Sequence, residues 1–145
     1  MSTLLLRLAG PLQAWGAKSK FEIRRTGREP SKSAVIGLLA AALGRKRDES
    51  MDDLSALRFG VRVDKEGHLL HDYHTVQMYS GKTYVPQRYY LSDATFLVGL
   101  ESENEELLKE IKEAILHPAF PLFLGRRSCV PSQPIVVGIR RTCLI

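Results

Sequence analysis

The chain has few of the features that mark secreted, membrane-bound or redox proteins. Its only cysteines, Cys129 and Cys143, form neither a C-x-x-C pair nor a zinc-ligand pattern. Reduced thiols are the default expectation for such a pair, with a disulfide as the alternative. No run of eighteen apolar residues exists, which excludes a membrane-spanning helix. Residues 1–16 lack the basic start and long apolar core of a signal peptide, so we expect a cytoplasmic protein.

Motifs of several common enzyme classes are also missing. The sequence contains no G-x-x-x-x-G-K-[ST], no G-x-S-x-G and no H-E-x-x-H, which argues against a P-loop nucleotide hydrolase, an α/β-hydrolase and a zincin. His71 and His74 are three residues apart. On a strand that spacing places them on opposite faces, so they do not predict a metal site. We expect no metal and no cofactor.

What is present indicates one globular domain that spans residues 1–145. The chain is 44% hydrophobic and 26% charged, which is close to the average for globular proteins. Its length suits a single well-filled core.

The charge is unevenly distributed along the chain. Residues 1–47 hold 10 basic and 2 acidic side chains, and residues 121–145 hold four arginines and no acid. Residues 48–57 and 93–120 carry net charges of −4 and −5. A positive face that attracts a polyanion, most often nucleic acid, is one interpretation, and a solvated basic surface is the other. On the first interpretation, we expect the separated cationic segments to come together in the folded protein.

Hydrophobic periodicity predicts four core strands and two helices. The strands are predicted at 3–8, 59–63, 94–100 and 135–139, and each is bounded by turn residues. A helix is predicted from Ser31 or Ser33 as N-cap to Gly44 as its end. A second helix is predicted from Ser102 as N-cap to Pro118, with a solvated acidic face from Glu101 to Glu113.

This order predicts an α+β fold. It is βαββαβ, the plan of a ferredoxin-like sandwich, with an inserted β-hairpin between the second and third core strands. The first and third strands occupy the centre of that sheet, and here they are the most apolar segments. Polar and aromatic arms around Ser80–Gly81–Lys82 indicate the hairpin, a thumb at about residues 72–92.

Two basic segments are candidates for binding phosphate. Arg24, Arg25 and Lys32 lie in the long connection after the first strand, and Lys32 with Ser33 begins the first helix, whose N-terminus favours anions. Arg126 and Arg127 follow Gly125 in a predicted tight turn. Trp15 and Phe21 in the connection are either base-stacking residues or, as we favour, buried anchors.

The predicted hairpin carries His74, Tyr84 and Arg88, which favour a nucleic-acid clamp. An alternative is metal-independent endoribonuclease chemistry, with His74 or His71, Lys82 and a tyrosine moving protons at a ribose hydroxyl. A further alternative is a protein adaptor whose acidic helix binds basic partners.

Three segments together resemble a known family. They are LLLRLAGPLQAWG at 4–16, PSKSAVIGLLAAALG at 30–44 and FLGRRSCVP at 123–131, with DYHTV at 72–76 between them. The chain resembles the CasD family of subunits of the type I-E CRISPR Cascade complex, within the RAMP superfamily.

The resemblance implies a ferredoxin-like domain with a hairpin thumb and a non-catalytic role in antiviral defence. Such subunits cap the 5′ handle of the CRISPR RNA, contact the backbone subunit CasC and assemble with the large subunit CasA. The Lys32–Ser33 helix start and the Arg126–Arg127 turn match family positions that face the handle. Family members continue past position 145, so we expect this chain to be a short member or a part of a longer protein.

Overall fold

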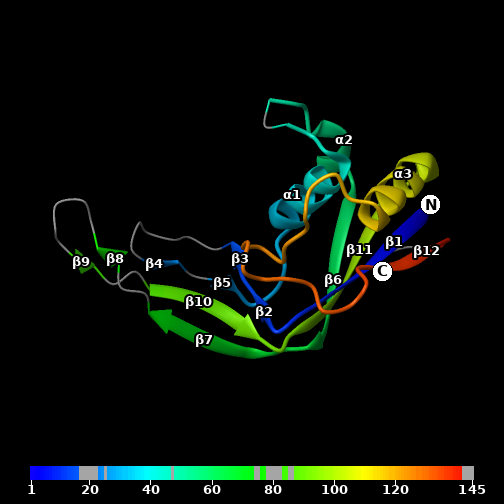
Figure 1. Cartoon of the computed structure of the whole chain (residues 1–145). Coiled ribbons are helices and arrows are strands. Elements are labelled where there is room, and N and C mark those ends of the chain that lie inside the picture. The colour runs from blue at the N-terminus through cyan, green and yellow to red at the C-terminus, as the bar shows by residue number, and fades with distance from the viewer. Residues whose placement is uncertain are drawn as a thin grey trace.

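The computed structural model describes residues 1–16, 23–24, 26–46, 48–73, 76–77, 83–84 and 87–141. For residues 16, 23, 24, 26, 27, 72, 73, 76, 77, 83, 84 and 87 only the backbone is described. The fold is α+β with few helices, and its strands pair antiparallel except for β4 (Ile23–Arg24) and β10 (Gln87–Ser92) among those described (Figure 1).

The core is built on a four-stranded antiparallel sheet. Its strands are β1 (Ser2–Ala9), β6 (Arg58–Lys65), β11 (Thr95–Ser102) and β12 (Val136–Arg140), in the spatial order β12-β1-β11-β6. The two most apolar strands, β1 and β11, are central, as predicted. Alternate side chains of both strands are fully buried under the helices: Leu4, Leu6, Leu8, Phe96, Val98 and Leu100.

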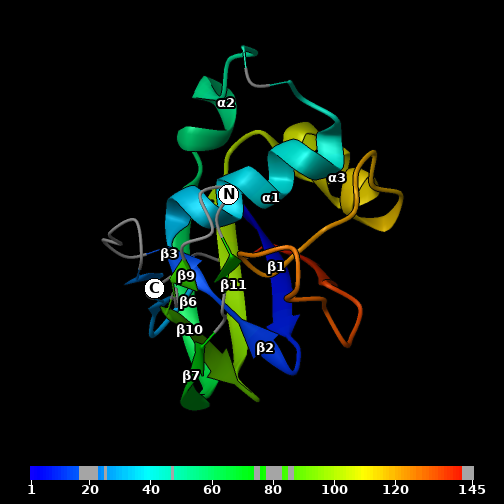
Figure 2. The same ribbon diagram turned by 60° about the vertical axis from the view of Figure 1, so that its left-hand side comes forward.

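Helix α1 (Lys32–Leu43) confirms the predicted segment and settles its cap. Ser31 is the N-cap, and its hydroxyl accepts a hydrogen bond from the Ala34 amide. Gly44 ends the helix with φ +74°, the left-handed conformation that glycine adopts most easily. The helix packs on the sheet beside α3 (Glu105–Leu116), and Figures 1 and 2 show both helices at the end opposite to β7 and β10.

Two expectations about the second helix were wrong. Asn104, not Ser102, is the N-cap of α3, and its side chain accepts from the Leu107 amide. The Ser102 hydroxyl instead accepts from the Asn104 amide. Glu101 is not on the helix: it belongs to β11, is 1% exposed, and pairs with Arg58 at 3.0 Å. β11 extends beyond its apolar run because its backbone stays paired with β1 as far as Ser102 and with β6 as far as Glu101.

Short strands organise the connection between β1 and α1. They are β2 (Leu12–Gln13), β3 (Trp15–Gly16), β4 (Ile23–Arg24) and β5 (Thr26–Gly27). Trp15 is 1% exposed, and its indole N–H donates to the Gln13 side chain at 3.0 Å, so it is the buried anchor rather than a stacking residue. Phe21 lies outside the described residues. A four-residue helix, α2 (Asp52–Ser55), precedes β6.

The predicted hairpin is present as two paired arms. β7 (His68–Tyr73) pairs antiparallel with β10 (Gln87–Ser92), and β8 (Val76–Gln77) pairs with β9 (Thr83–Tyr84). We call residues 68–92 the projecting hairpin, because Figure 1 shows its arms extending away from the four-stranded sheet. Its turn at Ser80–Gly81–Lys82 lies outside the described residues. Among the described residues, no helix is long and apolar enough to span a membrane.

Candidate nucleic-acid interface

The root of the projecting hairpin joins three segments that are distant in sequence. β10 pairs with β2 through Leu91 and Ser92, and with β4 in parallel, where Arg88 lies beside Arg24. Arg24 is therefore next to the hairpin along the backbone. Its side chain is not described. The Arg88 side chain is half-buried, and its Nε is buried without a hydrogen-bond partner in the described structure.

Arg126 brings a second cationic segment to this root. Its guanidinium donates from Nη1 to the backbone oxygen of Tyr89 at 3.0 Å and lies 4.9 Å from the ring centroid of Tyr90. Tyr90 is 4% exposed. Residues two apart on a strand share a face, so Arg126 covers the face of β10 that also carries Arg88. On the opposite face, the Tyr89 ring stacks on His71 at 4.3 Å.

Arg126 and Arg127 belong to a closed turn, which we call the arginine turn (residues 124–129). The Leu124 amide donates to Cys129 O at 2.7 Å, and the Cys129 amide donates to Arg126 O at 2.9 Å. Both of these anchoring residues are fully buried, while Arg127 is exposed. The turn therefore holds one arginine against the hairpin and directs the other toward solvent.

Gly125 makes this turn possible. Its φ is +99°, and a Cβ at this position would lie 1.6 Å from the Ala14 carbonyl oxygen. The Ala14 amide donates to Leu124 O at 3.0 Å, which ties the turn to the segment between β2 and β3. Only glycine permits both this backbone conformation and this close approach.

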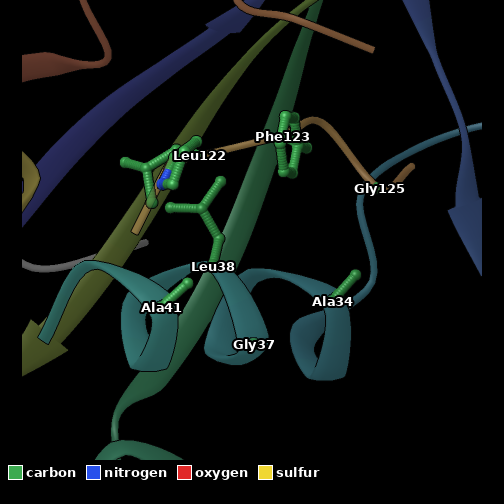
Figure 3. Close-up of a pocket in the computed structure, with 8 residues that line it drawn as sticks. Ala34, Gly37, Leu38, Ala41, Leu122, Phe123 and Gly125 are labelled. Atoms are coloured by element: carbon green, nitrogen blue, oxygen red, sulfur yellow. The ribbon is translucent and has the colours of Figure 1, made fainter. Parts of the chain in front are cut away.

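The start of α1 lies across an apolar pocket from the arginine turn (Figure 3). The pocket has a volume of about 320 Å³. It is lined from α1 by Ala34, Gly37, Leu38 and Ala41 and from the facing segment by Pro121, Leu122, Phe123 and Gly125. Ala34 directly follows Lys32 and Ser33 in the sequence, and Gly125 directly precedes Arg126. Two of the predicted cationic segments therefore lie on opposite sides of this one pocket.

At the start of α1, Lys32 and Ser33 are exposed, and the first turn contains no acidic residue. The first amide groups of a helix have no acceptor within it, so this end favours an anion. The Lys32 ammonium donates to Ser55 O at 2.7 Å. That contact turns the side chain toward α2, and it leaves two ammonium protons for another acceptor.

Several other cations of the described chain are neutralised by carboxylates. Arg45 binds Asp53 at 2.6 Å, and this hydrogen bond holds the pKa of that carboxyl below its usual value, although burial acts in the opposite direction. Arg62 lowers the pKa of Asp64 in the same way, through a hydrogen bond at 2.6 Å. By contrast, no carboxylate of the described chain pairs with Lys32, Arg88 or Arg127 within 4.0 Å. Lys32, Arg88 and Arg127 are therefore available to bind an external anion.

The structure thus describes the predicted site residues to different extents. Side chains are described for Lys32, Ser33, Arg88, Arg126 and Arg127, and backbone alone for Arg24 and Tyr84. Arg25 and His74 lie outside the described residues, as does Lys82. Sequence reasoning missed the contact of Arg126 with Tyr89 and Tyr90. The consecutive tyrosines Tyr89 and Tyr90 were the available signal, but nothing in the sequence pairs them with residue 126.

Chemistry based on a thiol or a metal has little support among the described residues. Cys129 is free and buried, and burial raises the pKa of its thiol. Cys143 lies outside the described residues. No group of three or more His, Cys, Asp and Glu side chains in the described part of the chain is arranged to hold a metal ion.

Known proteins are similar to this chain in sequence and in fold. The family described as CRISPR-associated protein (Cas_Cas5) matches residues 3–142. A relative from Escherichia coli (strain K12), the CRISPR system Cascade subunit CasD, is 39% identical over 158 residues, which cover 94% of this chain and 70% of the relative.

Two solved structures superpose on nearly the whole chain. One, described as the crystal structure of a Cas protein, has a TM-score of 0.82 at 51% identity, over 98% of this chain and 67% of the other. The second, from a CRISPR RNA-guided surveillance complex, has a TM-score of 0.84 at 37% identity, over 97% of this chain and 64% of the other. The chain therefore spans about two thirds of the length of these structures.

The α+β fold of this chain is thus similar to that of a Cas protein and of a chain in a CRISPR RNA-guided complex. The chain belongs to the Cas5 family, and its sequence is CasD-like.

Proposed function

We propose that this chain is a non-catalytic RNA-binding subunit of a CRISPR surveillance complex that caps the 5′ handle of the CRISPR RNA. The observation that carries the proposal is the convergence of β4, β10 and the arginine turn at the hairpin root, with the start of α1 across the apolar pocket from that turn. The similarity to a subunit named for Cascade and to a chain of an RNA-guided complex supports it.

The fold supports a ferredoxin-like domain over residues 1–145. The core elements follow the order β1, α1, β6, β11, α3, β12, and the spatial order β12-β1-β11-β6 has the first and third core strands at its centre. On this proposal the projecting hairpin, inserted between β6 and β11, is the thumb predicted at about 72–92. It would contact the adjacent backbone subunit CasC, with CasA as a further partner in the cytoplasm.

We assign the phosphate contacts to cations that no carboxylate with a described side chain neutralises. Lys32, Arg88 and Arg127 supply the positive charge, and Ser33 adds donors at the start of α1. Arg24 is placed beside Arg88 by the strand pairing, and Arg25 follows it in sequence. His74 and Tyr84 on the hairpin are proposed to clamp the strand, since aromatic and imidazole rings stack on splayed bases.

We propose that the apolar pocket between α1 and the arginine turn takes one splayed base. The pocket lies between Lys32 and Arg127, so a strand bound to both passes its mouth, and Phe123 in its lining offers a ring to stack on.

Gly37→Trp tests this base site, because Gly37 lines the pocket and a Cβ there meets no atom within 4 Å. We expect the indole to fill the pocket without unfolding the chain and to weaken RNA binding about tenfold, the loss of one stacked base. Gly37→Ala is the control and keeps full affinity. Unchanged binding of RNA by the tryptophan variant would exclude the pocket as a base site.

The binding proposal is tested by the salt dependence of affinity for a single-stranded RNA with the 5′-handle sequence. We expect Lys32→Ala and Arg127→Ala each to lower the slope of log K against log salt by about one, because each removes one phosphate contact. Arg62→Ala is the matched control, since Arg62 is already paired with Asp64, and its slope stays that of the parent. No RNA binding by the parent chain at low salt would refute the proposed function and favour the protein adaptor.

Incubation of the chain with RNA tests the non-catalytic assignment. Handle and repeat RNA should be recovered intact after incubation with the chain in EDTA. A sequence-specific product that disappears in His74→Ala would identify the endoribonuclease alternative instead.

A further inference from the structure

We propose that Arg126 is a positioning residue that sets the direction of the projecting hairpin, and that it does not bind phosphate. Its guanidinium already has two partners on the hairpin: Nη1 donates to Tyr89 O at 3.0 Å, and Cζ lies 4.9 Å from the Tyr90 ring centroid. A cation within about 6 Å of an aromatic centroid is attracted to the ring face. Arg127, the next residue, is exposed and makes no such contact with the described residues of the hairpin.

Arg126 can position the hairpin only if its own backbone is held by the body of the protein. One backbone hydrogen bond ties the turn to the body, from Ala14 N to Leu124 O at 3.0 Å. Two more close the turn on itself, from Leu124 N to Cys129 O at 2.7 Å and from Cys129 N to Arg126 O at 2.9 Å, and both Leu124 and Cys129 are fully buried. The contact of Gly125 with Ala14 leaves no room for the turn to shift inward. Arg126 therefore projects from a fixed base.

The hairpin, by contrast, is joined to the body near one end. β10 pairs with β2 only through Leu91 and Ser92, at the end of the strand that leads into β11. Tyr89 and Tyr90 come next along the arm, and Arg126 contacts both residues. Beyond them, β10 pairs with β4 through Gln87 and Arg88, and β4 does not belong to the four-stranded sheet. The Arg126 contact therefore ties the arm to the arginine turn between two short strand pairings, and its loss would let the arm tilt about Leu91.

The length of the hairpin makes this contact important for RNA. An extended strand rises about 3.3 Å per residue, so Thr83 in β9, seven residues before Tyr90, can lie up to roughly 23 Å from it. A rotation of about 10° at the root would displace residues at that distance by roughly 4 Å, which exceeds the tolerance of a hydrogen bond. Tyr84 in β9, and His74 after β7, would then miss the strand that Lys32 and Arg127 hold. The role therefore rests on the proposed function.

A phosphate ligand and a positioning residue differ in their salt dependence. Loss of a phosphate contact reduces the number of counterions released and lowers the salt slope by about one. Loss of a positioning contact lowers the affinity for RNA but leaves the number of phosphate contacts unchanged. The slope of log K against log salt therefore stays the same. The two adjacent arginines allow this comparison within one turn.

The experiment measures handle-RNA affinity from low to moderate salt and hydrogen exchange of the β10 amides in the RNA-free chain. We expect Arg126→Ala to weaken binding about tenfold with an unchanged slope and to speed exchange at 87–92. Tyr90→Leu should do the same, and the double variant should be no worse than either single variant, because both remove one contact. Tyr90→Phe keeps the ring and should match the parent. Arg127→Ala should lower the slope without changing exchange.

A slope lowered by about one in Arg126→Ala, with exchange at 87–92 unchanged, would overturn the proposal and make Arg126 a phosphate ligand. If Arg126→Ala does not fold, Arg126→Lys and Tyr90→Leu carry the test, since lysine retains the charge but not the planar fork. If the parent chain binds no RNA, the proposed function fails, while the exchange measurement still decides whether Arg126 holds the hairpin.

Discussion

Gly125→Ala is expected to destabilise the chain by about 2–4 kcal/mol and to abolish most RNA binding. The new Cβ would lie 1.6 Å from the oxygen and 2.6 Å from the carbonyl carbon of Ala14, and the residue would have to keep a φ of +99°. The clash cannot be relieved by a side-chain movement, because the obstructing oxygen belongs to the backbone of Ala14, which is buried. The left-handed φ is in addition strained for alanine. The arginine turn must therefore move outward, and it carries Arg126 away from Tyr90 and Arg127 away from the proposed interface.

Chemical denaturation and RNA titration of Gly125→Ala measure both losses. Gly37→Ala is the matched control, since its Cβ meets nothing within 4 Å and replaces glycine inside a helix. That control should gain about 0.5–1 kcal/mol of unfolding free energy, because alanine loses less backbone entropy on folding. A Gly125→Ala variant as stable as the parent would show that the arginine turn can accommodate a Cβ at this position, which would contradict the predicted clash with Ala14.

Gln13→Leu is expected to cost about 2–4 kcal/mol of unfolding free energy and to lower the melting temperature by roughly 10 °C. The Gln13 side chain is fully buried. Its amide donates to Leu8 O at 3.1 Å and to Ala94 O at 2.8 Å, and its oxygen accepts from the Trp15 indole at 3.0 Å. Leucine has a similar volume but can replace none of these bonds, so polar atoms would lose their partner inside the core.

Thermal and denaturant unfolding of Gln13→Leu test this role. The control is Gln133→Leu, the same substitution at an exposed position, which should change stability by less than about 0.5 kcal/mol. Because Gln13 joins β2 to the ends of β1 and β10–β11, hydrogen exchange should rise first around Leu8 and Ala94. Equal stability of the two leucine variants would mean that the network contributes little.

The core of the fold could be predicted because its signals are local. The alternation of Leu4, Leu6 and Leu8 predicts one buried strand face, and all three residues are fully buried. Ser31 and Gly44 bracket α1 as N-cap and terminating glycine. Hydrophobic alternation and capping depend on neighbours within a few residues, so the chain order alone reveals them.

The errors of prediction occurred where a non-local contact competes with a local rule. Ser102 is a good cap by residue type, but strand pairing with Ser2 keeps it in β11, and Asn104 caps the helix instead. Glu101 looked like part of a solvated acidic face. It is buried because β11 continues past its apolar run and places it beside Arg58. Both outcomes depend on strands that are tens of residues away.

The sequence by itself determined the α+β class, the central strands, the first helix and the presence of cationic segments, because each depends on residue order and type. Only the tertiary structure decided which cations share a surface and what each one contacts. Arg126 and Arg127 are adjacent and chemically identical, yet one covers Tyr90 and the other is exposed. The difference arises from a turn closed against Ala14, more than a hundred residues earlier, and from a hairpin that reaches the same place from another part of the chain.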